Sequence, residues 1–174
     1  GADVTCDLEA VAVGHNAHAN GERSVAIGEG VNCGPYSTAV GTDAKASGTY
    51  DVAIANTASA SGGCSIAIGY NSKSTMSNSI AIGHSANAAH STSIAIGYDA
   101  KTSADHQIVL GTVNETVYIP GNLRVDGNVE LGVRADKYVA LRINEGLSDG
   151  GGWNFFGRPA FKDGNYSDHR IITL

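Results

Sequence analysis

The segment SIAIGYNSKSTMSNSIAIGHSANAAHSTSIAIGYDA, residues 65–100, contains one short motif three times. Its tripeptide Ile-Ala-Ile is always followed by Gly, and the period is 14 residues. Extended in both directions, the pattern gives eight copies, which close at Gly14, Gly28, Gly41, Ala55, Gly69, Gly83, Gly97 and Gly111. Only the step from Gly28 to Gly41 is shorter, at 13 residues. Repetition at a short fixed period indicates a solenoid.

Each copy contains two stretches in which alternate residues share a character, and this pattern predicts two short strands. In the fifth copy, Ile66-Ala67-Ile68 is followed by the turn-forming Asn71 and then by Ser72-Lys73-Ser74. Two strands and two turns would form one flattened coil, and successive coils would pair as parallel strands about 4.8 Å apart. The sequence therefore predicts an all-β fold, a parallel β-roll solenoid of eight repeats of about 14 residues.

The small middle residue of each triplet suggests how the roll is used. We expect the large Val and Ile residues to fill the coil, opposite the small residues of the second strand. The middle alanines would then point outward, where a small side chain lets another backbone approach. The sequence predicts that a homo-oligomer interface is formed by Ala12, Ala26, Ala39, Ala53, Ala67, Ala81 and Ala95.

The repeat motif Ser-Val/Ile-Ala-Ile-Gly resembles the head repeat of the YadA-like trimeric autotransporter adhesins. The motif occurs at residues 24–28, 65–69, 79–83 and 93–97, and the resemblance covers about residues 10–111. It implies a left-handed β-roll and a homotrimer. The copy at residues 51–55 lacks both the Ser and the Gly, and Thr38 replaces an aliphatic residue beside the shortened step. We expect local irregularity there without loss of the roll.

The remaining segments predict a domain organisation with an N-terminal extension (1–9), the roll (10–111), connector strands (112–133) and a small β-rich C-terminal tip domain (134–174). IPGNLRVDG, residues 119–127, resembles the neck of phage and large-virus fibre proteins. Residues 167–170, Ser-Asp-His-Arg, resemble the opening of the self-cleaving chaperone at the ends of viral fibres, although the Lys expected after them is absent.

The tip contains an aromatic cluster that has two interpretations. Its rings could form the core of a small domain, or they could line a surface that binds a host receptor or a glycan. In the second case the binding residues are Trp153, Asn154, Arg158 and Tyr166.

Composition and motifs exclude several classes of function. A net charge of −6 gives no electrostatic reason to bind nucleic acid or an anionic membrane. No apolar run is long enough for a membrane-spanning helix, and no catalytic motif is present. His15 and His18 lack a further metal ligand nearby, so we expect neither a metal nor another cofactor. Three cysteines, Cys6, Cys33 and Cys64, are too few for a disulfide framework.

Our main interpretation is a non-enzymatic structural and adhesive protein, a trimeric fibre or spike segment on a virion surface whose tip contacts the host. It rests on the neck-like segment and on the lack of a stalk and membrane anchor, which bacterial members of the family possess. The alternative is the head of a bacterial trimeric autotransporter adhesin, which would bind host matrix or cells from the bacterial surface. A third hypothesis, a glycan-processing enzyme on a solenoid scaffold, would require a carboxylate-lined groove.

Overall fold

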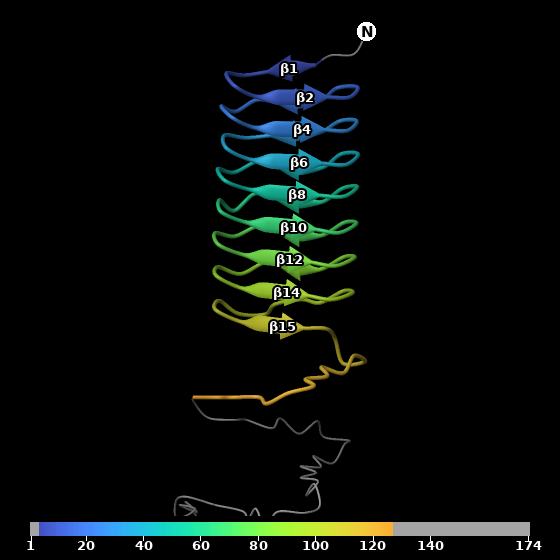
Figure 1. Ribbon diagram of the computed structural model, residues 1–174, viewed down its shortest axis with the longest axis vertical. Coiled ribbons are helices and arrows are strands. Elements are labelled where there is room, and N and C mark those ends of the chain that lie inside the picture. Colours follow the sequence, from blue (N-terminus) through green and yellow to red (C-terminus); the bar gives the residue numbers. More distant parts are fainter. Residues whose placement is uncertain (1–3, 127–174) are drawn as a thin grey trace, which may run out of the picture. The chain divides into compact units, whose positions relative to one another are not determined.

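The chain divides into two compact units, Gly1–Leu123 and Arg124–Leu174, and the computed structural model describes residues 4–126. The first unit contains a stack of flattened coils, seen from the side in Figure 1. All regular secondary structure in residues 4–126 is strand. None of these residues forms a helix that could span a bilayer.

Each coil except the last contributes one strand to each of two sheets, and every strand pair is parallel. The first sheet, here called the aliphatic sheet, consists of β2 (Val11–Val13), β4 (Val25–Ile27), β6 (Thr38–Val40), β8 (Val52–Ile54), β10 (Ile66–Ile68), β12 (Ile80–Ile82), β14 (Ile94–Ile96) and β15 (Ile108–Leu110). The second, called the polar sheet, consists of β1 (Thr5–Cys6), β3 (His18–Ala19), β5 (Asn32–Cys33), β7 (Lys45–Ala46), β9 (Ser59–Ala60), β11 (Lys73–Ser74) and β13 (Asn87–Ala88). The predicted parallel β-solenoid of about eight turns is confirmed.

Equivalent residues of neighbouring coils lie directly above one another. Ala67 pairs with Ala53 on one side and with Ala81 on the other. The shortened step leaves this register intact, because Val25 pairs with Thr38 while Cys33 pairs with Ala46. Both pairs are 13 residues apart, so the missing residue falls in the turn between β5 and β6. As expected, the roll continues through its two irregular copies.

The interior of the roll is lined by small side chains, and this overturns the predicted orientation of the first strand. Ala67 is fully buried, whereas Ile66 and Ile68 on either side of it are partly exposed. Ala26, Ala39, Ala53, Ala81 and Ala95 are likewise fully buried, and Ala12 is half-buried against the core. The prediction that these alanines face outward and form the oligomer interface is wrong.

The reason lies in the residues that share a strand face with each alanine. Ser65 and Ala67 leave the chain on the same side, both are small, and both are fully buried. The polar sheet faces them with Ser72 and Ser74, which are also fully buried. The largest fully buried side chains of the described residues are Val31, Asp51 and Cys33. Such a narrow interior has no room for a row of isoleucines, so the isoleucines point outward.

The glycine that closes each triplet is required by both backbone conformation and space. Gly83 has a φ of +132°, which L side chains rarely adopt, and a Cβ there would collide with the carbonyl oxygen of Gly97. Ala55 occupies the equivalent position with a φ of 112°. The turn that follows contains a left-handed residue, for example Asn71 or Asp99, each with a φ of 54°. Asn and Asp tolerate this conformation better than most residues.

Candidate functional site

The outer face of the aliphatic sheet is a continuous apolar surface. Apart from Thr38, every outward residue of its eight strands is Val, Ile or Leu. Half of these positions expose between 37% and 64% of the residue, namely Val11, Val13, Ile27, Ile54, Ile82, Ile96, Ile108 and Leu110. Soluble monomers rarely expose an apolar patch of more than a few hundred Å². This face therefore has the character of an interface.

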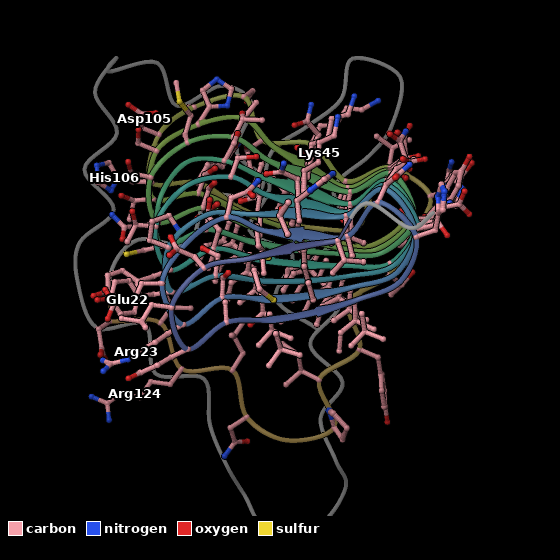
Figure 2. All side chains as sticks on the ribbon, turned by 90° about the horizontal axis from the view of Figure 1, so that it is seen from above. Glu22, Arg23, Lys45, Asp105, His106 and Arg124 are labelled. Carbon is pink, nitrogen blue, oxygen red and sulfur yellow. The ribbon has the colours of Figure 1, made fainter. Side chains whose placement is uncertain are left out.

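The outer face of the polar sheet is hydrophilic over its whole length. Its central outward column runs His18, Asn32, Lys45, Ser59, Lys73, Asn87 and Lys101. Figure 2, which looks along the stack, shows Lys45 pointing away from one broad side of the coil. The predicted orientation of this strand is confirmed, because Ala44 and Ala46 on either side of Lys45 are fully buried.

Aromatic rings stack at the turns that follow three consecutive triplets, those of β10, β12 and β14. The ring centroids of Tyr70 and His84 lie 5.1 Å apart, and those of His84 and Tyr98 are separated by the same distance. All three residues are exposed. They occupy the position after the repeat glycine. Their common position in successive copies was the signal that they stack.

The opposite turn contains a charged and aromatic cluster. Figure 2 shows Glu22 and Arg23 at one narrow end of the coil. The Arg23 side chain lies 2.6 Å from a Glu9 carboxylate oxygen, and Tyr36 donates a hydrogen bond of 3.0 Å to Glu22. That hydrogen bond raises the pKa of the Tyr36 phenol above its ordinary value. Tyr36 also stacks on Tyr50 at a centroid distance of 5.1 Å. These contacts join successive coils along the edge of the roll.

Asp51 is a buried carboxylate in the copy that lacks the motif serine. It occupies the position that Ser65 and Ser79 hold in other copies and has no exposed surface. Its Oδ2 accepts a hydrogen bond of 2.7 Å from the Gly48 amide, and its Oδ1 accepts from both the amide and the hydroxyl of Ser65. Because the carboxylate is enclosed and its acceptors are used by the roll itself, Asp51 stabilises the turns and offers nothing to a ligand.

Histidine and cysteine residues form no metal centre in the part of the chain that is described. No group of three His, Cys, Asp or Glu side chains lies close enough to hold an ion there. The Nδ1 of His18 is 2.8 Å from the Thr5 hydroxyl, and Cys33 is buried while Cys6 and Cys64 are exposed. Burial raises the pKa of the Cys33 thiol to about 11. The predicted tip residues Trp153, Asn154, Arg158 and Tyr166 lie outside the described residues.

Comparison with known proteins identifies the repeat. A family model described as the YadA head domain repeat (2 copies) matches residues 8–30, 34–54, 56–72, 60–86, 74–100 and 91–111, which together make up more than half of the chain. Among solved structures, the chain is similar to the crystal structure of the collagen-binding domain of Yersinia adhesin YadA. The identity is 30%, the match covers 77% of this chain and 72% of that chain, and the TM-score is 0.48. No curated protein matches the chain.

Proposed function

The chain belongs to the family of YadA head domain repeats, and on that premise we propose that it is the adhesive head segment of a bacterial surface protein. The repeat is a structural adhesin fold and not an enzyme family. The observation that carries the proposal is the family match along nearly the whole roll, residues 8–111. The bacterial setting therefore has more support than the virion surface, which no comparison supports.

The proposed assembly is a homotrimer that buries the aliphatic sheet. In a cyclic trimer every subunit contacts both neighbours through a head-to-tail interface that closes into a ring, and here the outward Val, Ile and Leu residues provide the surface that faces the common axis. The strands are in register, so the apolar side chains form straight rows along the roll. Three such faces around one axis would remove these rows from water and contribute the hydrophobic free energy that the narrow interior lacks.

The proposed ligand is a component of the host matrix or the host cell surface. Collagen is the first to test, since the matched Yersinia domain is named for binding it. The tip residues Trp153, Asn154, Arg158 and Tyr166 remain a second proposed contact, for a host receptor or glycan.

Beads coated with the purified chain provide the experiment. We expect retention on collagen-coated surfaces or on host cells, and none on albumin. Failure on every matrix protein and on cells would contradict the adhesive function.

The complete gene decides the setting. We expect a coiled-coil stalk and a membrane anchor downstream of the roll in a bacterial adhesin. A self-cleaving chaperone in that position would restore the viral fibre interpretation.

A further inference from the structure

Three lysines stand in one straight column on the outer face of the polar sheet. Lys45 and Lys73 both pair with Ser59, and Asn87 lies between Lys73 and Lys101. Consecutive lysines are thus two strands apart, a distance of about 9.6 Å, since paired strands lie about 4.8 Å apart. All three lysines are exposed. The column presents positive charge at a regular interval along the roll.

The charge of this column differs in sign from that of the whole chain, which is −6. Lys101 has an acidic neighbour, because its Nζ lies 2.9 Å from an Asp99 carboxylate oxygen. Within residues 4–126, no carboxylate lies within 4.0 Å of Lys45 or Lys73. No Asp or Glu occupies the column itself between His18 and Lys101. An anionic ligand would therefore meet no carboxylate at Lys45 or Lys73, and at Lys101 it would compete with Asp99.

A second column on the same side supplies hydroxyl groups. Ser47, Ser61 and Thr75 each lie two residues after the central column, and all three are exposed. A hydroxyl can both donate and accept a hydrogen bond. Ammonium and hydroxyl groups side by side match a ligand that carries acidic groups and many hydroxyls.

We propose that the lysine column binds an anionic polysaccharide that lies along the roll, with one acidic group at each lysine. The proposal rests on the proposed adhesive function, because the polar sheet would face outward once the aliphatic sheet is buried. An extended polysaccharide with one acidic group per disaccharide repeats its charge every second sugar ring, a length comparable to the lysine spacing.

Extended peptides fit this surface less well. In a β-strand, side chains on one face recur at about 6.7 Å, which is out of step with the lysines. A polyproline II peptide repeats at about 9.3 Å, but grooves that bind such peptides are lined by aromatic residues. From Asn32 to Lys101 the column contains Asn, Ser and Lys only. The surface therefore favours a sugar chain.

The test measures binding of the full chain to hyaluronan, which has one carboxylate per disaccharide, to heparin, and to neutral dextran. We expect binding to both polyanions that weakens with added salt, and none to dextran. Lys45→Gln, Lys73→Gln and Lys101→Gln combined should weaken binding about tenfold or more, since each exposed charge pair contributes modestly.

Two control variants separate spacing from net charge. Lys73→Asn combined with Asn87→Lys keeps composition and net charge but destroys the regular interval, so its binding to hyaluronan should fall about threefold or more. Arg124→Gln removes one cation outside the column and should leave hyaluronan binding unchanged. Light scattering and thermal unfolding of every variant verify that assembly and fold are retained.

Each outcome decides the proposal. Absence of polyanion binding by the wild-type chain, or equal binding by the triple variant, overturns it. Unchanged hyaluronan binding by the rearranged variant overturns the role of the spacing. Loss of collagen retention alone in the triple variant would assign the column to a peptide and contradict the polysaccharide. Wild-type retention on matrix without polyanion binding would leave the adhesive function standing and reject this inference.

Discussion

The two sheets of the roll share one interior and one register but present opposite outer faces. Inward residues are small on both sides, as Ala67 and Ser74 illustrate, and both are fully buried. Outward, the first sheet carries Ile66 and Ile68 while the second carries Lys73. The interior is therefore what specifies the coil, because only small residues fit it. Outward side chains need not be small. The two outer faces can therefore serve different roles, assembly on the aliphatic sheet and ligand contact on the polar sheet.

The largest expected effect comes from placing charge in the shared interior. Ala81→Arg would bury an unpaired guanidinium where the side chain has no exposed surface. We expect a loss of more than about 4 kcal/mol in the free energy of unfolding, enough to abolish the folded roll. Circular dichroism during urea unfolding measures it. Asn87→Arg, on the outer face of the polar sheet, is the matched control and should unfold like the wild type. A stable Ala81→Arg roll would contradict the orientation of the alanines.

Charge on the aliphatic face should break assembly and spare the fold. Ile68→Lys combined with Ile82→Lys adds two charges to the proposed trimer interface. We expect a folded monomer in light scattering with an unchanged strand signal in circular dichroism. Asn32→Lys combined with Asn87→Lys adds the same charge to the polar face and should remain trimeric. If both double variants assemble equally, the two faces do not differ in the way proposed.

Substitutions at the position that closes each triplet should change the free energy of unfolding by less, and in opposite directions. Gly83→Ala introduces a Cβ at a φ of +132° and against the next coil, so we expect a loss of about 1–3 kcal/mol in the free energy of unfolding. Ala55→Gly should gain about 1 kcal/mol, because Ala55 has a φ of 112°. Thermal unfolding of the two variants compares them. A more stable Gly83→Ala variant would show that the column tolerates a side chain.

The reactivity of the three cysteines should distinguish the buried thiol from the exposed ones without any substitution. The pKa of the Cys33 thiol is raised to about 11 by burial, so its thiolate is scarce until the pH approaches that value. We expect iodoacetamide at pH 8 to modify the exposed Cys6 and Cys64 and to leave Cys33 intact, with mass spectrometry as the measurement. Denaturant should expose all three thiols. Rapid modification of Cys33 in the folded chain would contradict its burial.

The periodicity of the sequence was sufficient to predict the coils, their parallel pairing and the outward lysines. It was not sufficient for the first strand, because alternation of Ile66, Ala67 and Ile68 defines two faces without saying which is inside. The usual rule that large apolar residues are buried was misleading, because the interior of the coil is too narrow for isoleucines. Ser65 indicated the inner face, because it leaves the chain on the same side as Ala67 and is also small.

Other features depend on contacts between coils that a single repeat does not reveal. The stack of Tyr70, His84 and Tyr98 becomes visible only when equivalent positions are superposed. The buried hydrogen bonds of Asp51 require the positions of Gly48 and Ser65 in three dimensions. Such features depend on the register between coils, which a single copy of the motif does not contain.

In the proposed trimer, sibling chains cover the aliphatic sheet, and sedimentation equilibrium of the wild-type chain measures whether they do. We expect a single species of three times the chain mass of 17.7 kDa. A species of 17.7 kDa that stays soluble as concentration rises would mean that the rows of Val, Ile and Leu face water, and it would contradict the trimer.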